Sequence, residues 1–406
     1  MSTLRLTGMK LSQTDLGTRI DYQYEAPDIL KAYIKGSPLF VEFPCDMDDV
    51  PQSILSIPFV GIMSTVTMLM EVNIEVPVLD ESFLKSIHLL SEVYENMYPH
   101  SKLNLSVCAK RTENARNAHG GGTALCFTGG VDATSAMIGL LDQSPVLLNI
   151  WGGDIRLTDS ESHEELDAYL GGLTKYLGLN YCFIKTNGRE MFYEDELGHL
   201  TTRHVGRKNE YGWWATIAHS LSMISTAIPW LWKTGLDTLC LGSTHAAKEQ
   251  SYDANNIELL NALSSQNWSI QIADGDLVRN EKVTKIVKWK EKTKAPIQLK
   301  VCWRRTAGKN CSSCEKCYRT ILNIMSNHGD PNDFGFEVNG DTLMRIKAYL
   351  ESHHVGVAFW GPIQQAFLAE REYWENDPEI AWILSIKLNS FKSLVMRIRR
   401  RIFRKK

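Results

Sequence analysis

The chain lacks both the long hydrophobic runs of a membrane protein and the strong charge imbalance of a general nucleic-acid binder. Its longest apolar stretches, residues 57–70 and 221–232, are shorter than a bilayer span and are interrupted by Ser, Thr or Pro. The formal net charge is only −3 over 406 residues, which argues against nucleic acid as a partner without excluding it. The sequence therefore predicts a globular protein with no transmembrane helix.

Signals for secretion and a regular disulfide pattern are also missing. The chain opens in mixed sequence, without a charged and then apolar leader, and its nine cysteines are an odd number. No nucleophilic cysteine follows Met1, so we expect no built-in glutaminase. A thiolate metal site suits a reducing compartment, and we expect a cytoplasmic protein.

Four of the cysteines are clustered near the end of the chain with the spacing C-x8-C-x2-C-x2-C. They are Cys302, Cys311, Cys314 and Cys317. The spacing is typical of a tetrahedral zinc site, and buried core thiols are a poor alternative because the intervening residues are mostly polar. A redox C-x-x-C remains the main competing interpretation. Zinc with four protein ligands has no open position for water, so we predict a structural ion.

The first part of the chain reads as a small α+β domain, residues 1–109. Alternating polar and apolar residues predict strands at 20–24, 39–43 and 73–78, and Asp80 is expected to cap a helix. Residues 110–122 are charged and then glycine-rich, which predicts a linker.

A different pattern begins at Thr123, where short apolar runs alternate with helical segments. The predicted strands are 124–127, 145–151, 181–184 and 238–241, and the predicted crossover helices are 161–177 and 213–233. This pattern predicts an α/β fold with a doubly wound parallel sheet over residues 123–330, followed by a helical extension at 331–406. Ligands of such sheets bind beyond the carboxyl ends of the strands.

A glycine-rich turn, residues 128–135, follows the first of these strands and reads Thr-Gly-Gly-Val-Asp-Ala-Thr-Ser. Its backbone N–H groups from Gly129 to Asp132 would converge at a helix N-terminus, which suits a pyrophosphate, and the turn is expected to visit positive φ. It is neither a Walker loop nor a Gly-x-Gly-x-x-Gly turn. Taken alone, it is equally well explained as a simple turn between strand and helix.

Residues 127–134 resemble the Ser-Gly-Gly-x-Asp-Ser loop of the PP-loop ATP pyrophosphatases, a superfamily with the adenine nucleotide alpha hydrolase-like (HUP-type) fold. Its members bind ATP and typically release pyrophosphate while adenylating a substrate. The cysteine spacing and its position after the sheet are similar to the 7-cyano-7-deazaguanine synthase family. Further segments resemble that family in the same order, namely 241–245, 251–255, 282–287 and 317–319. The resemblance covers about residues 123–328.

The resemblance implies ATP, Mg2+ and a structural Zn2+ as cofactors. The residues it places at ATP are Thr128, Gly129, Gly130, Val131, Asp132, Thr134, Ser135, Gly153 and Gly242. The expected catalytic residues are Asp132, which would hold Mg2+ or its water, Lys282, which would contact the phosphates, and His245, which would act as an acid or base. For Asp132 a helix N-terminal acid is the alternative, and for His245 a hydrogen-bonded loop histidine.

The sequence departs from the family at two places. Ala133 replaces the last Ser of the loop, so Thr134 or Ser135 would have to supply the lost hydroxyl, and residues 252–256 lack the Arg of the family's substrate segment. We therefore expect the same activation chemistry on a different substrate: adenylation of a small carboxylate or amide, pyrophosphate release, and ligation or amidation by an external amine or ammonia. Three alternatives stay open: an epimerase or modifier of a cell-envelope or polysaccharide precursor, a tRNA-modifying enzyme, and an inactive nucleotide-binding module.

Residues 391–406 combine apolar positions at helical spacing with many Lys and Arg, which predicts a basic amphipathic helix. A solvated terminal helix is the simplest interpretation, and weak contact with a membrane surface is the second. The sequence leaves open whether the chain forms a homodimer.

Overall fold

The computed structural model describes residues 2–101, 103–116, 121–206, 211–243, 252–302, 304 and 308–389. The chain forms two compact units that interleave in sequence. The first contains residues 1–127, 139–163 and 178–276, and the second contains residues 128–138, 164–177 and 277–406. Both the loop predicted to bind phosphate and the clustered cysteines therefore belong to the second unit.

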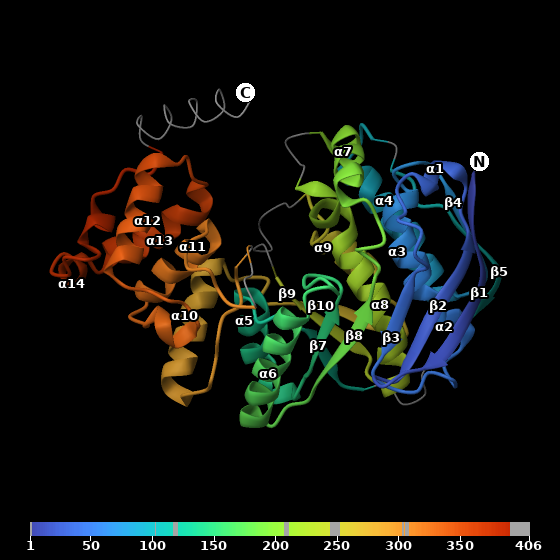
Figure 1. The fold of residues 1–406 in the computed structure, drawn as a ribbon, viewed down its shortest axis with the longest axis horizontal. Coiled ribbons are helices and arrows are strands. Elements are labelled where there is room, and N and C mark those ends of the chain that lie inside the picture. The colour runs from blue at the N-terminus through green and yellow to red at the C-terminus, as the bar shows by residue number, and fades with distance from the viewer. Residues whose placement is uncertain are drawn as a thin grey trace. The chain divides into compact units, whose positions relative to one another are not determined.

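The first unit is built on one sheet of ten strands (Figure 1). In chain order they are β1 (Thr3–Gln13), β2 (Thr18–Glu25), β3 (Phe40–Phe43), β4 (Asn73–Asp80), β5 (Val107–Glu113), β6 (Thr123–Cys126), β7 (Val146–Trp151), β8 (Tyr181–Thr186), β9 (Thr238–Gly242) and β10 (Ser269–Ala273). Their spatial order is β10-β9-β6-β7-β8-β3-β2-β1-β4-β5. The protein is thus α/β, with a mixed and mostly parallel sheet that is compatible with a doubly wound fold.

Strands from both sides of the predicted linker share this sheet. β3 pairs antiparallel with β8, so the early strands continue the later ones rather than forming a sheet of their own. β5 pairs with β4 through Glu113, so residues 110–113 are strand and not linker. The sequence missed this because β5 is charged and mostly exposed on its outer half, and the burial signal of a strand is weak there.

The five strands from β6 to β10 form a parallel block with the order β10-β9-β6-β7-β8. Counted from β6, this is the strand order 5-4-1-2-3 of a doubly wound fold, and chain direction across the sheet reverses between β6 and β9. The chain leaves β6 at Phe127 and continues directly into the glycine-rich turn. Asn149 of β7 donates from Nδ2 to the Phe127 carbonyl at 2.9 Å and so fixes the exit of β6.

The core of the first unit includes two helices whose residues are almost all buried, α3 (Ile57–Thr67) and α8 (His219–Thr234). They pack closely because residue 61 is glycine: a Cβ there would lie 2.2 Å from Ser225 Oγ. A π-helical turn, residues 214–218, precedes α8, so the predicted helix 213–233 exists with an irregular first turn. The other helices of the unit are α1 (Asp28–Lys31), α2 (Gln52–Leu55), α4 (Glu81–Met97), α7 (Glu194–Val205) and α9 (Ile257–Ala262).

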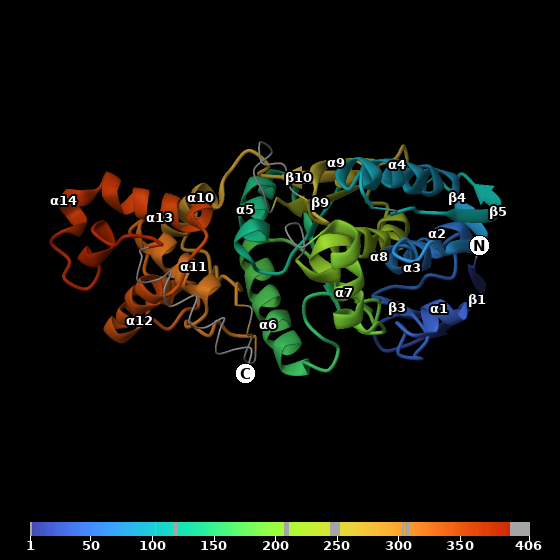
Figure 2. The ribbon, with the colours of Figure 1, turned by 90° about the horizontal axis from the view of Figure 1, so that it is seen from above.

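The second unit is built from helices, and its α10, α11, α12 and α13 gather together in Figure 2. Its helices are α5 (Val131–Gly139), α6 (Ser160–Leu177, from residue 164 on), α10 (Arg279–Thr293), α11 (Glu315–Met325), α12 (Gly340–Ser352), α13 (Val357–Ala369) and α14 (Arg371–Trp374). The predicted basic helix at 391–406 lies outside the described residues. Within the described part of the chain, no helix has the length and apolar character needed to cross a membrane.

Candidate metal centre and candidate anion site

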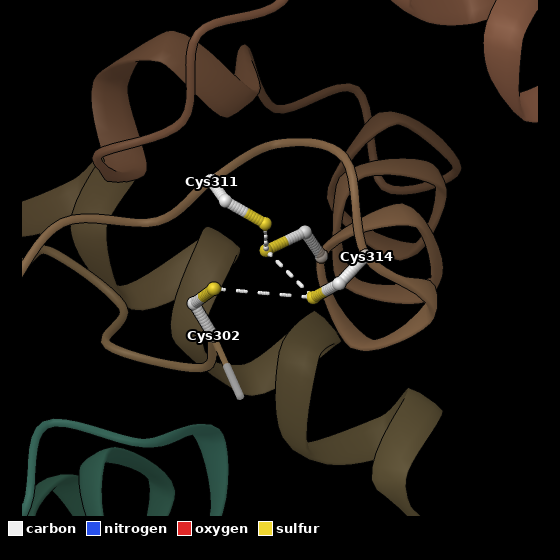
Figure 3. Close-up of side chains that lie close together, drawn as sticks. Cys302, Cys311 and Cys314 are labelled. Carbon is white, nitrogen blue, oxygen red and sulfur yellow. Dashed lines mark hydrogen bonds between the residues drawn. The ribbon is translucent and has the colours of Figure 1, made fainter. Parts of the chain in front are cut away.

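The four clustered cysteines converge in the second unit (Figure 3). Their Sγ atoms all lie within 4.8 Å of one another, and three Sγ–Sγ distances are 3.9 Å (302 to 314), 4.0 Å (311 to 317) and 3.4 Å (314 to 317). Zn–S bonds of about 2.3 Å at tetrahedral angles require sulfurs about 3.8 Å apart. The cluster therefore fits a tetrahedral metal ion such as zinc.

Local backbone features bring these sulfurs together. Cys314 is the N-cap of α11 and Cys317 lies in the first turn, while Ser312, at φ +45°, turns the chain between Cys311 and Cys314. Asn310 holds the loop against the preceding segment of the backbone, since its Nδ2 donates to the Leu299 carbonyl at 2.6 Å. Three of the four cysteines are buried and Cys311 is half-buried, so the ion would be enclosed by protein as in a structural site.

Neighbouring thiols and burial raise the pKa values of two of these thiols. Contact with Cys314 and then burial raise the pKa of the Cys317 thiol, and burial raises the pKa of Cys302. Ionising several thiols this close together would be costly without a cation. A divalent ion removes that cost by binding the thiolates directly, and the chemistry of the donor set thus fits the predicted Zn2+.

The glycine-rich turn leads into α5 as predicted. Gly129 adopts φ +73°, and its carbonyl accepts a hydrogen bond from the Lys300 backbone N–H at 2.7 Å. A Cβ on Gly129 would lie 3.0 Å from Lys300 Cγ, whereas one on Gly130 would meet nothing closer than Thr128 Oγ1 at 3.5 Å. Only the first glycine is therefore needed for backbone geometry. At Gly130 a side chain would fit without a close contact.

Asp132, in the first turn of α5, is held by two cations from the start of α10. Its Oδ2 accepts from Arg279 Nη1 at 2.9 Å, and its Oδ1 lies 3.4 Å from Lys282 Nζ. The Lys282 side chain is only 1% exposed, while those of Arg279 and Asp132 are 26% and 23% exposed. The first N–H groups of a helix have no intrahelical acceptor and add positive potential at the same point. Two cations and these amides thus converge on one carboxylate.

The remaining predicted residues divide between the two units. Thr134 and Ser135 are fully buried in α5, and Thr134 Oγ1 has no hydrogen-bond partner among the described residues. Gly153, after β7, and Gly242, at the end of β9, belong to the first unit. His245 lies outside the described residues. The second unit thus brings together Asp132, Lys282 and the turn from Thr128 to Val131.

Sequence reasoning missed a second ion pair that supports the turn. Lys300 Nζ lies 2.7 Å from Glu165 Oε1, and Tyr169 of the same helix contributes its hydroxyl as acceptor for the Gln298 N–H at 3.3 Å. Glu165 and Lys300 are 135 residues apart, and each looks like an ordinary surface charge in the sequence. No local pattern could have paired them.

The chain matches no protein-family model, no curated protein and no solved structure in comparisons with known proteins. The class of the protein is therefore described from its fold and its sites alone. It is an α/β protein with a mostly parallel sheet and a four-cysteine cluster that could hold a metal ion.

Proposed function

We propose that the protein is an ATP-dependent enzyme of the PP-loop type, which adenylates a carboxylate or amide substrate and releases pyrophosphate. The observation that carries the proposal is the cluster of Asp132, Arg279 and Lys282 at the N-terminus of α5, next to a glycine turn that follows β6. The strand order supports it, because doubly wound sheets bind ligands where chain direction reverses, and β6 borders that point.

The proposed chemistry transfers adenylate to the substrate oxygen. That oxygen attacks the α-phosphorus of ATP, the bond from the α-phosphorus to the bridging oxygen breaks, and pyrophosphate leaves with the electron pair. Lys282, Arg279 and the amides of the turn would stabilise the charge that develops on pyrophosphate. Asp132 is the residue that would hold Mg2+, which would supply further positive charge to the phosphates, and an external amine or ammonia would then displace AMP.

One observation favours a second candidate, a nucleotide-binding module without turnover. Both carboxylate oxygens of Asp132 face cations, at 2.9 and 3.4 Å, an arrangement that opposes a divalent ion at the same carboxylate. Ala133 also lacks the hydroxyl that the family carries at this place. Such a module would bind ATP at the same residues and release no pyrophosphate.

The test incubates the full chain with ATP, Mg2+ and pooled carboxylic and amide metabolites, and follows pyrophosphate and the adenylate by mass spectrometry. Lys282→Met should lower the rate about 100-fold, since it removes one charge that stabilises the leaving group. Met matches Lys in length and suits a buried position, and Arg279 still faces Asp132, so the variant should fold. Arg371→Gln, which removes an exposed charge of α14, is the matched control. ATP binding without pyrophosphate from any pool would favour the binding module, and absence of ATP binding would refute both.

A further inference from the structure

The outer face of α10 is strongly basic, although the chain as a whole is slightly acidic. Residues 285–294 contain five Lys and one Glu, a net charge of +4 in ten residues, whereas the whole chain carries −3. Lys285, Lys288 and Lys292 follow one another at the helical spacing i, i+3 and i+7, so they lie on one side of the helix. The other side is the buried one, with Lys282, Val283, Ile286 and Val287. The positive charge is therefore concentrated on the solvent side of α10.

Packing inside the second unit does not account for this row of lysines. Lys288 and Lys292 are exposed, and neither forms an ion pair within the described part of the chain. Lysine in the last turn of a helix favours the helix dipole, which explains Lys292 but not Lys288, more than one turn before the end. Lysines at i and i+4 repel each other, so the row costs the helix stability. The exposed Glu291 offsets only one of the charges.

The metal cluster does not cancel this charge either. A Zn2+ ion on four thiolates would carry a net charge of about −2. That charge would sit at the sulfurs around the start of α11, three of which are buried, and not on the solvent side of α10. An anionic partner from outside the chain is what the outer face of α10 would attract.

An exposed aromatic ring lies at the end of the row of lysines. Tyr176 of α6 is 52% exposed, and its Oη donates to the carbonyl of Thr293, the residue after Lys292, at 2.5 Å. Lys175, next to Tyr176, is exposed as well. The hydrogen bond holds the ring beside the lysines while leaving about half of the side chain open to solvent. Exposed aromatic rings beside basic groups are typical of sites for single-stranded nucleic acid, where bases stack on the rings and the cations contact phosphates.

We propose that Lys288 and Lys292 on the outer face of α10, together with Tyr176 at the end of α6, bind a single-stranded nucleic acid. The two lysines are about 6 Å apart along the helix axis and would contact neighbouring phosphates, and the ring would stack on an unpaired base. A duplex offers the same phosphates but no free base face for the ring. The proposed function depends instead on Lys282, on the buried side of α10, so the two proposals can fail separately.

The test measures binding of the full chain to short fluorescein-labelled oligo-uridine RNA and oligo-thymidine DNA by fluorescence anisotropy over a range of salt concentrations. The double variant Lys288→Gln with Lys292→Gln should weaken binding about 10- to 30-fold at about 0.1 M salt. It should also lower the slope of log affinity against log salt by about 1.4, at about 0.7 for each lost phosphate contact. Both lysines are exposed, so this variant should fold. The matched control, Lys347→Gln with Lys387→Gln, removes two exposed lysines elsewhere in the unit and should stay within about twofold of the wild type.

The role of the ring is tested with Tyr176→Leu. This variant should weaken single-strand binding about 5- to 50-fold and leave binding of a duplex of the same length within about twofold, because paired bases have no face free for stacking. Residues 391–406 are present in every variant, so binding through that basic segment cancels in the comparison.

Wild-type affinity in the lysine double variant would overturn the inference, and so would an equal loss of single-strand and duplex binding in Tyr176→Leu. Lysine-dependent binding to phosphatidylserine vesicles without binding of either oligonucleotide would overturn it in favour of a membrane surface. If the proposal is right, RNA and DNA strands both depend on the two lysines, and the tighter of the two identifies the polymer that the face prefers.

Discussion

The contact between Asp132 and the buried Lys282 should be a main stabiliser of the junction between α5 and α10. At 3.4 Å and an effective dielectric constant of 20, the gross attraction is about 5 kcal/mol. Asp132→Asn keeps a hydrogen-bonding oxygen, and Lys282 has further contacts, so part of this is retained. We expect the opening free energy of α10 to fall by about 2–4 kcal/mol, because a charge at 1% exposure loses its contact with the Asp132 carboxylate.

Hydrogen exchange with mass spectrometry on peptides from α10 measures this opening directly. Glu375→Gln, which breaks the exposed pair with Arg371, is the control and should change the opening free energy of the preceding helix α14 by less than about 0.5 kcal/mol. The double variant Asp132→Asn with Lys282→Met should lose less than the sum of the two single variants. A change in α10 below about 0.5 kcal/mol for Asp132→Asn, or strict additivity, would refute the assigned pairing.

Three further outcomes follow from other parts of the structure. Gly129→Ala should destabilise the protein in urea by about 1–2 kcal/mol, since φ is +73° there, while Gly130→Ala should be nearly neutral, and equal effects would contradict the turn geometry. The purified chain should carry about one zinc ion by elemental analysis, and Cys314→Ser should lose it; unchanged metal content would exclude the site. Iodoacetamide at pH 8 should label the exposed Cys108 well before Cys182, whose pKa burial raises to about 12, so that its reactive thiolate is scarce until the pH nears that value.

Much of the fold could be predicted because its signals are local. The apolar run at 145–151 predicted a central strand, and β7 spans Val146–Trp151. Asp80 was expected to cap a helix, and its Oδ1 accepts from the Phe83 N–H at 3.0 Å at the start of α4. Three of the four clustered cysteines belong to the same category, since residues 311–317 form a single turn and the start of a helix. In each case a few neighbouring residues contain the whole pattern.

The division of the chain could not be predicted in this way. Residues 128–138 and 164–177 join a unit whose remaining residues begin at 277, although both segments lie between strands of the other unit. Contacts such as that of Tyr176 Oη with the Thr293 carbonyl at 2.5 Å, over 117 residues, bring these segments together. A crossover helix has the same amphipathic pattern whether it packs against the sheet or against other helices. The sequence therefore predicts that the helix exists but does not predict to which of the two units it belongs.

The role of Asp132 follows from that nonlocal arrangement. Read in sequence, an acid in the first turn of a helix suits either the helix dipole or a metal ion, and the two readings cannot be separated. In the folded chain the same carboxylate lies between Arg279, at 26% exposure, and Lys282, at 1%. Of these two cations, Arg279 reaches solvent and Lys282 is buried. The carboxylate of Asp132 is therefore an ion-pair partner of residues 147 and 150 positions away, an arrangement that no local pattern in the sequence could reveal.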